Sequence, residues 1–496
     1  MAAANEALRS LNTSQLVTAL AGLVISYYVA QILYRAYFGP LSDFPGPRLR
    51  ALSGLPSIWT TISGTDHQVI PALHKKYGPI VRLAPNELSF AGGAQAWADI
   101  HGPRKGVLPH KDPVFYPSSI NGANSLMTAP DEDHSKQRKL MSYAFSERTL
   151  KEQEPLLKSW AAKMKTKLAE RVASGQEVDM VKFYNCTTFD IMADFLFLQG
   201  LNLLEDGEYS PWMQNLFNSF KAATIVLGFR RYSAWFNSLI EYYVKNNEQA
   251  RKAEFEHFRY AAERIDDRWH RTVSRLDPWA EFLSSLSVEE QHVSASALMV
   301  AGTETTATAL SGLTYLLLKR PEAMEKLKTE IRSNLKNFEE VTLESLARLK
   351  YTQACLQEAL RLYPPVPSGL PRITPPGGLT ICDRFVPGNT VVSVHHMATY
   401  RSPALFHNPD KFAPERWLGD PEYADDRLDA VEPFQTGNRG CLGQNLAWHE
   451  MRLLLATILL HFDVKPGPGS DTWIDQKVYV LWAKKPLFVS LEAVEG

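Results

Sequence analysis

A glycine-rich segment with a single cysteine, Phe434–Gly443, constrains this chain more than any other ten residues. It reads FQTGNRGCLG, so Cys441 stands between glycines and two positions after an arginine. Glycines have no side chain and let the backbone pass close to a large, flat molecule. From Gln444 onward an apolar pattern predicts a helix, which puts Cys441 just before a helix N-terminus. That end favours negative charge, so we expect a lowered pKa for the thiol.

A cysteine in such a loop is either a metal ligand or a buried structural residue. A thiolate is a soft, electron-rich ligand that suits haem iron, and surrounding N–H groups would tune its donation. Free cysteines are also among the most buried residues, so a lone cysteine is more often structural. The motifs upstream of the loop favour the ligand.

Length, charge and cysteine content limit the classes of protein to which this chain can belong. The 496 residues contain no Ser/Gly-rich linker, charge block or internal repeat after the N-terminal region, so we expect one large domain. A net charge of −1 gives no indication of a nucleic-acid partner. Four scattered cysteines suit reduced thiols in a cytosol-facing protein.

The apolar run Leu16–Tyr34 predicts a membrane anchor at residues 13–35. A buried core helix and a cleaved signal peptide are the alternatives, although the run is longer than the apolar core of most signals. Arginines follow the run, which favours a lumenal N-terminus at residues 1–12 and a cytosolic body. Prolines predict a stiff, extended hinge at 36–50, followed by a single domain at 51–496.

Within the body, periodicity predicts a mainly α protein with a smaller β portion. Two short strands are expected at Tyr77–Leu83 and Glu87–Phe90, and a third at Thr390–Val394. Helical patterns dominate between them, from Asp133 to Leu362.

An acid and an alcohol stand side by side in the longest predicted helix. Ser287–Glu290 has the form of a capping box, and Pro321 ends the run. Glycine and threonines weaken the helix at Ala301–Thr306, and a buried acid is costly without a purpose. We therefore expect a local break where Glu304 and Thr305 manage protons. The alternative is an intact helix whose hydroxyls bond to carbonyls four residues earlier.

Glu358 and Arg361 are three residues apart, so they share one face of a helix that ends before Pro364. Most such pairs are exposed and contribute little. The pair is therefore informative only beside the other motifs.

Together these motifs resemble the cytochrome P450 superfamily. The cysteine segment fills every specified position of the haem-binding pattern F-x-x-G-x-R-x-C-x-G, the acid–alcohol pair fits A/G-G-x-D/E-T-T/S, and the helical pair fits E-x-x-R. The positions of the haem-binding pattern are Phe434, Gly437, Arg439, Cys441 and Gly443. The resemblance spans nearly the whole chain and implies the P450 fold with haem b, Cys441 being its axial ligand.

The resemblance also implies roles for the other motifs. Thr305 would hydrogen-bond the oxygen ligand and its water, and Glu304 would help to relay protons for O–O cleavage. Glu358 and Arg361 would form a buried cluster with a later arginine, Arg416, that supports the cysteine loop.

Three arginines and a histidine match the family's propionate-binding positions. Arginine suits this role because guanidinium groups bind carboxylates bidentately. They are Arg439, Arg372 and Arg138, with His134 in place of the tryptophan usual in W-x-x-x-R. Histidine can still donate a hydrogen bond. The alternative for His134 and Arg138 is a solvated helix face beside Asp131–Asp133.

The family's substrate-pocket positions are mostly apolar here, which suits a lipophilic small molecule, and no acidic or basic anchor is evident. These positions are Phe115, Leu298, Ala301, Ser368, Gly369 and Leu370.

The implied activity is that of a haem-thiolate monooxygenase using O2 and two electrons. No dinucleotide fingerprint is evident in the cysteine loop, so electrons should come from a separate NADPH–cytochrome P450 reductase, with cytochrome b5 as a second donor. We expect the protein to lie in the endoplasmic reticulum membrane, with its catalytic domain in the cytosol and the glycosylation sequon of Asn12 in the lumen. Residues 32–41 and His134 most resemble fungal P450s akin to trichothecene hydroxylases and pisatin demethylase, which implies a terpenoid, polyketide or alkaloid substrate, as in mycotoxin pathways.

Three other functions stay open. A P450-fold enzyme can work without a reductase, as a peroxygenase, isomerase or nitric oxide reductase. The chain could also be a haem-binding protein without turnover, or a membrane scaffold without a cofactor. The intact Glu304–Thr305 pair disfavours the first two.

Overall fold

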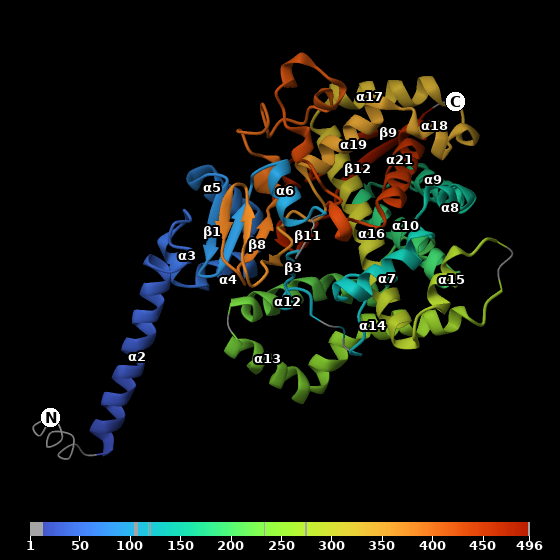
Figure 1. Ribbon diagram of the computed structural model, residues 1–496. Helices are drawn as coiled ribbons and strands as arrows, with labels where there is room; N and C mark the ends of the chain where they lie inside the picture. Colours follow the sequence, from blue (N-terminus) through green and yellow to red (C-terminus); the bar gives the residue numbers. More distant parts are fainter. Residues whose placement is uncertain are drawn as a thin grey trace, which may run out of the picture.

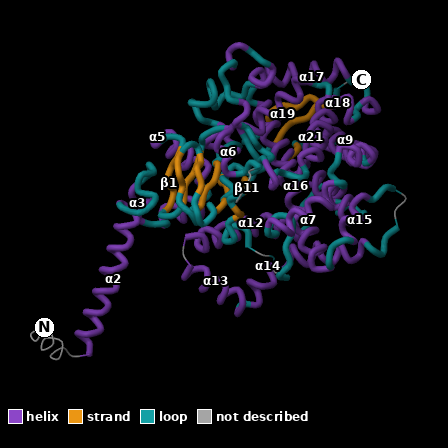
Figure 2. Tube along the Cα trace, in the orientation of Figure 1, coloured by secondary structure: helices purple, strands orange, loops and turns teal. Residues whose placement is uncertain are grey.

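The computed structural model describes residues 13–494 apart from 104–107, 118, 120, 233, 273 and 274. The expected lumenal segment 1–12, with Asn12, lies outside the described residues. Most of the described chain is helical and the strands are short, which confirms the mainly α class (Figure 2). Figure 1 shows the helices gathered around a central one, α16, and a separate helix, α2, projecting from the body.

The α-helices are α2 (Thr13–Tyr37), α3 (Arg48–Leu52), α4 (Leu55–Ile62), α5 (Asp66–Tyr77), α6 (Ala94–Ile100), α7 (Asp131–Ser142), α8 (Glu147–Glu152), α9 (Glu154–Ala173), α10 (Met180–Phe197), α11 (Leu203–Asp206), α12 (Pro211–Tyr232), α13 (Ala234–Asn246), α14 (Glu248–Arg268), α15 (Pro278–Ser284), α16 (Val288–Leu318), α17 (Pro321–Asn334), α18 (Leu343–Ala347), α19 (Lys350–Leu362), α20 (His396–Tyr400) and α21 (Gln444–His461). Short 3-10 helices are η1 (Phe338–Glu340), η2 (Pro414–Leu418), η3 (Pro421–Tyr423), η4 (Leu428–Ala430), η5 (Gly437–Arg439) and η6 (Ser470–Thr472).

The strands are β1 (Ile80–Ala84), β2 (Glu87–Phe90), β3 (His110–Lys111), β4 (Val178–Asp179), β5 (Arg372–Ile373), β6 (Leu379–Ile381), β7 (Arg384–Val386), β8 (Val391–Val394), β9 (Phe462–Pro466), β10 (Lys477–Tyr479), β11 (Leu481–Ala483) and β12 (Phe488–Ala493). The largest sheet has the order β1-β2-β8-β5-β3, in which β2 and β8 run parallel and the other neighbours antiparallel. The strands expected near residues 80, 87 and 391 are therefore present and lie together in this sheet.

The long helix α16 is continuous, so the expected break at Ala301–Thr306 is wrong. Packing compensates for the weak helix formers: Gly302 lies against Met192, where a Cβ would come within 2.8 Å of the sulfur. The hydroxyl of Thr305 donates to the carbonyl oxygen of Ala301 at 2.8 Å, as in the alternative interpretation. The capping box predicted at the start of the helix is present.

Helix α2 is the one described helix long and apolar enough to cross a membrane, and its side chains apart from Gln31 and Ala36 are exposed. The interval expected as an extended hinge, 36–50, instead contains the end of α2, a series of turns and the start of α3. Arg82 of β1 holds this interval, because its guanidinium donates to the carbonyl oxygens of Arg35, Ala36 and Leu41 at 3.2–3.3 Å. One buried arginine thus supplies hydrogen-bond donors to carbonyl oxygens at the end of α2 and in the turns that follow it.

Candidate active site

The cysteine loop lies immediately before α21, as predicted. The Cys441 side chain is exposed to the space beside the loop, and its backbone N–H donates to the Phe434 carbonyl oxygen at 2.7 Å. Gly437 has a φ of +73°, and a Cβ there would collide with the carbonyl oxygen of His101. Gly443 is less constrained, since the nearest atom to a Cβ would be a ring carbon 3.6 Å away. The loop thus requires glycine at position 437 but not at position 443.

The pKa of Cys441 is raised, not lowered as the sequence suggested. Although the side chain borders open space, the surrounding protein removes the thiol from bulk water and so raises this pKa, while the Gly443 amide and the charge of Arg138 lower it by less. Loss of hydration therefore outweighs the helix N-terminus. A thiolate at this position needs a further positive charge, such as a metal ion bound to the sulfur.

Arginines tie the loop to α7 and to the segment before it. Arg138 of α7 donates from Nη1 to the carbonyl oxygen of Gly440 at 2.7 Å. Arg439 bonds to Asp131 at 2.6 Å and to the Ala129 carbonyl oxygen at 2.7 Å. Burial raises the pKa of Asp131, but its bond to Arg439 more than reverses this. The alternative that Arg138 belongs to a solvated helix face is wrong, because its guanidinium is hydrogen-bonded to the cysteine loop.

Two cations beside this loop are less well neutralised. Arg372 is 5% exposed, and its guanidinium has no hydrogen bond or ion pair within the described residues. Lys111 pairs with it across β3 and β5, donates from Nζ to the Met127 carbonyl oxygen at 2.5 Å, and lies 4.3 Å from the ring centroid of Tyr116. Burial and the charges of Arg372 and Arg439 lower the pKa of Lys111 to about 7.

This arrangement fits a haem. A buried guanidinium needs an anionic partner, and a propionate supplies one with bidentate geometry. His134 is 3% exposed, and burial with the charges of Arg439, Arg138 and Lys111 lowers its pKa to about 4. It is therefore neutral near pH 7 and can donate one N–H to an anion without adding charge.

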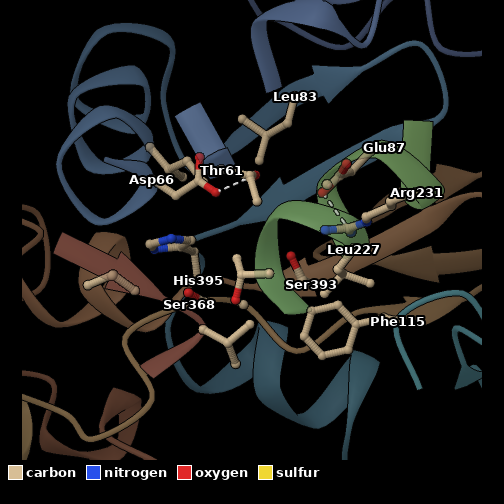
Figure 3. Close-up of a pocket in the computed structure, with 16 residues that line it drawn as sticks. Thr61, Asp66, Leu83, Glu87, Phe115, Leu227, Arg231, Ser368, Ser393 and His395 are labelled. Carbon is tan, nitrogen blue, oxygen red and sulfur yellow. Dashed lines mark hydrogen bonds and ion pairs between the residues drawn. The ribbon is translucent and has the colours of Figure 1, made fainter. Parts of the chain in front are cut away.

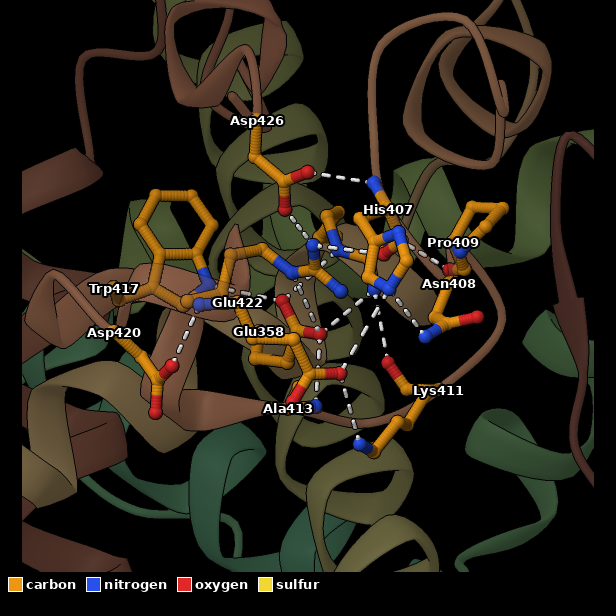
Figure 4. Close-up of polar contacts among 12 residues, drawn as sticks. Glu358, His407, Asn408, Pro409, Lys411, Ala413, Trp417, Asp420, Glu422 and Asp426 are labelled. Carbon is orange, nitrogen blue, oxygen red and sulfur yellow. Dashed lines mark hydrogen bonds and ion pairs between the residues drawn. The ribbon is translucent and has the colours of Figure 1, made fainter. Parts of the chain in front are cut away.

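The E-x-x-R pair forms a fully buried cluster with Arg416, which joins α19 to η2 (Figure 4). Glu358 of α19 accepts from Arg361 at 2.7 and 2.9 Å, from Arg416 Nε at 3.3 Å and from Trp417 Nε1 at 2.9 Å. Arg416 is also paired with Asp426. All of these side chains come from segments that precede the cysteine loop in the sequence.

Thr305 and Glu304 lie on different faces of α16. Ala301 is exposed and Thr305 half-buried, although most of their neighbours on α16 are buried. Glu304 is 2% exposed and turns away, to an ion pair with Lys484 at 2.6 Å. The adjacent Thr306 meets Glu450 of α21, so this part of α16 packs directly on the helix that follows the cysteine.

A separate pocket lies between α4, α12 and the sheet and is partly open to solvent (Figure 3). Arg231 of α12 reaches across it to Glu87 of β2 at 2.8 Å and lies 3.9 Å from Asp112. This pocket therefore contains charged side chains, unlike the mostly apolar positions expected around the substrate. Its lining includes Thr61, Asp66, Leu83, Glu87, Phe115, Leu227, Arg231, Ser368, Gly369, Ser393 and His395.

Comparison with known proteins decides the family. The profile of the family "Cytochrome P450" matches residues 45–491. The chain is 43% identical to "Cytochrome P450 monooxygenase efuB" of Hormonema carpetanum (95% of this chain, 96% of the relative). It is 37% identical to "Averantin hydroxylase" of Dothistroma septosporum (95% and 90%).

The chain belongs to the cytochrome P450 family.

Membership establishes the enzyme class as a monooxygenase, an oxidoreductase, and implies haem with cysteine thiolate ligation. P450 monooxygenases use a redox partner, O2 and a small-molecule substrate. The predicted fold and enzyme class are thereby confirmed.

The structure brings half of the six predicted substrate-pocket residues together. Phe115, Ser368 and Gly369 line one pocket, whereas Leu298, Ala301 and Leu370 do not line it. The sequence did not point to several further candidate residues, because only contacts between distant segments of the chain distinguish them. They are Lys111, Arg231, Glu87 and Lys484.

Proposed function

We propose that this P450 monooxygenase binds haem b through Cys441 and inserts one oxygen atom into a lipophilic secondary metabolite of a fungus. The observation that carries the assignment is the exposed Cys441 sulfur beside buried cations that lack a carboxylate partner, Arg372 above all. The names of the relatives support the substrate class, "Averantin hydroxylase" being one. Terpenoid, polyketide and alkaloid skeletons remain the candidate substrates.

Each group around the loop has a defined task in this proposal. Cys441 donates its thiolate, and Arg138 holds the loop through the Gly440 carbonyl oxygen. Arg372, Lys111 and the neutral His134 receive the propionates. Bound haem supplies the iron at which O2 is activated with two electrons.

On α16 the uncovered stretch at Ala301 and Thr305 offers the face for oxygen and substrate. The Thr305 hydroxyl accepts a hydrogen bond with its free lone pairs while it donates to Ala301. In this way it holds a water molecule near the reacting oxygen. The residues of the Arg231 pocket admit the substrate from the side of the anchor helix and the sheet.

Membrane attachment follows from α2. Its length suits a bilayer span, and exposed Leu49, Leu55 and Trp59 lie just after it in sequence. We place the protein in the endoplasmic reticulum membrane with its catalytic domain, residues 51–496, in the cytosol. Electrons come from NADPH–cytochrome P450 reductase in the same membrane, with cytochrome b5 as a second donor.

One experiment tests the assignment. Microsomes containing the chain and reductase are given candidate metabolites, and products are analysed by mass spectrometry with and without NADPH. Oxygenated product that requires NADPH, reductase and O2 supports the proposal. Product formed with peroxide alone would favour a peroxygenase. Loss of the thiolate-type carbon monoxide spectrum in Cys441→Ala, with retained expression, tests the ligand independently.

A further inference from the structure

One wall of the Arg231 pocket carries polar atoms that have no hydrogen-bond partner within the described residues. Ser393 of β8 and His395, just after this strand, both line the pocket (Figure 3). The backbone at His395 is still extended, so side chains two positions apart point to the same side of the chain. The two residues are 5% and 2% exposed, which removes both from bulk solvent.

The imidazole of His395 is held in place by the helix that it precedes. Its Nδ1 accepts from the backbone N–H of Ala398 at 3.3 Å, so His395 caps the N-terminus of α20. Its own backbone N–H donates to the Phe90 carbonyl oxygen at 3.0 Å. The ring is therefore fixed with Nδ1 toward α20 and Nε2 on its other side.

This cap determines which ring nitrogen carries the proton. A nitrogen that accepts a hydrogen bond uses its lone pair, so the proton of the neutral ring lies on Nε2. Burial lowers the pKa of His395 well below its ordinary value of 6.5, and the neighbouring His74 and His396 lower it further. The Nε2–H group is therefore a donor without a net charge.

The Nε2–H donor of His395 is left without an acceptor. Nε2 is buried and has no hydrogen-bond partner within the part of the chain that the structure describes. The nearby His74 differs, because its two nitrogens bond to the Gly78 carbonyl oxygen at 3.0 Å and to Ser89 Oγ at 2.8 Å. A buried N–H without an acceptor is costly, so a ligand that supplies one gains affinity.

Two hydroxyl groups belong to the same region of the pocket. Ser368 and Ser393 both line it, and neither hydroxyl has a hydrogen bond within the described residues. Gly369 leaves room for one of them, because a Cβ there would lie 2.6 Å from Ser393 Oγ. Since Ser368 and Gly369 match substrate-pocket positions of the family, we take this wall as part of the substrate region.

Charge favours a neutral oxygen over an anion as the ligand of His395. The carboxylates of Asp66 and Glu87 also line the pocket, and Arg231 is paired with Glu87. A ligand carboxylate would therefore meet two like charges and an uncharged imidazole. A carbonyl oxygen accepts hydrogen bonds without bringing a charge. Apolar side chains elsewhere in the lining suit a carbon skeleton; they are Ile70, Leu83, Leu227, Val478 and Val480.

We propose that His395 is a specificity-determining residue whose Nε2–H binds a carbonyl oxygen of the substrate, with the Ser393 hydroxyl as a second donor. The proposal rests on the function proposed above and narrows its substrate class to lipophilic metabolites that carry a ketone or quinone carbonyl. A skeleton held at one end in this way presents fewer of its carbon atoms for oxidation.

The test compares ketones with hydrocarbons of the same shape. Three pairs of probes are used: fluorenone and fluorene, xanthone and xanthene, benzophenone and diphenylmethane. Their dissociation constants are measured with the purified full-length holoenzyme, from the change in the haem absorption spectrum and by calorimetry. The ratio within each pair is compared between native protein and variants, which cancels differences in hydrophobicity.

Two substitutions of His395 separate the donor from the helix cap. Asparagine places an oxygen near the position of Nδ1 and keeps the cap, but it does not reach the position of Nε2. Glutamine reaches that position with an N–H group and gives up the cap. His395→Asn should therefore lose roughly 3- to 10-fold in preference for the ketone, whereas His395→Gln should keep most of it.

Three results would overturn the proposal. The first is the absence of a ketone preference over the His395→Asn variant in all three pairs. The second is a preference that is kept in His395→Asn and lost in His395→Gln, because it would then follow the cap. The third comes from infrared spectra of bound fluorenone, in which the C=O band should lie at lower frequency in native protein and His395→Gln than in His395→Asn. The same frequency in all three proteins would contradict the assigned hydrogen bond.

Ser393→Ala keeps the proposal testable if the His395 variants do not fold. It leaves the helix cap intact and should weaken the ketone preference by a smaller factor. An unchanged preference there, with His395 variants that give no carbon monoxide spectrum, would also overturn the proposal.

Failure of the proposed function would look different. Ketone selectivity that depends on His395, without NADPH-dependent oxygenation of any candidate metabolite, would refute the proposed function and support the carbonyl subsite. Oxygenation without ketone selectivity would refute the subsite alone.

Discussion

We expect Lys111 to make haem binding sensitive to pH. Its pKa of about 7, against an ordinary 10.5, results from burial next to Arg372 and Arg439. A propionate beside the ammonium would restore the charged form, so haem binding takes up a proton wherever the free protein has lost it. Haem affinity should therefore be highest below pH 7 and fall as the pH rises.

The magnitude follows from the same pKa. About half of Lys111 is protonated at pH 7 and about one-hundredth at pH 9, so the affinity falls about 50-fold over this interval if the haem-bound lysine stays charged. Arg372 and Arg439 remain charged throughout the interval. His134 remains neutral because its pKa is about 4.

The assay is the partition of haem between the protein and an apo-globin scavenger at pH 7, 8 and 9. Lys111→Arg is the matched control, since arginine keeps its charge and should give a nearly flat profile. Lys111→Met should bind more weakly at pH 7 and also be flat. A native profile as flat as that of Lys111→Arg would refute the reasoning.

Three further outcomes are expected. Arg416→Met breaks the buried cluster around Glu358 and should cost about 3–5 kcal/mol in the free energy of unfolding, measured with denaturant; a loss under 1 kcal/mol would contradict the cluster's role. Gly437→Ala should abolish the thiolate-type carbon monoxide spectrum because its Cβ collides with backbone, whereas Gly443→Ala should retain it. Deleting residues 1–37 should release the chain from carbonate-washed membranes; full retention there would point to a second anchor.

Most of the fold and the centre of the site could be predicted from local motifs in the sequence. The glycine-rich cysteine loop, the helix from Gln444 and the capping box at Ser287 depend on neighbours within a few residues, and each is present. Contacts between distant segments could not be predicted from one sequence. Arg231 and Glu87 are 144 positions apart, and no local pattern links them.

Two errors have a common physical cause. The helix around Thr305 was expected to break because its residues are poor helix formers, yet packing against α10 outweighs those propensities. The thiol of Cys441 was expected to be acidic because it precedes a helix, yet desolvation outweighs the helix end. In both cases the surroundings, which a sequence does not display, contribute more than the local preference.

Arg82 has a consequence for how substrate arrives. Its guanidinium grips the end of α2, while the next residue of the same strand, Leu83, forms part of the pocket wall. The candidate anchor helix and one wall of the pocket are therefore connected through the same strand, β1. In the proposed membrane arrangement, a change in the tilt of α2 would change the direction in which the pocket opens.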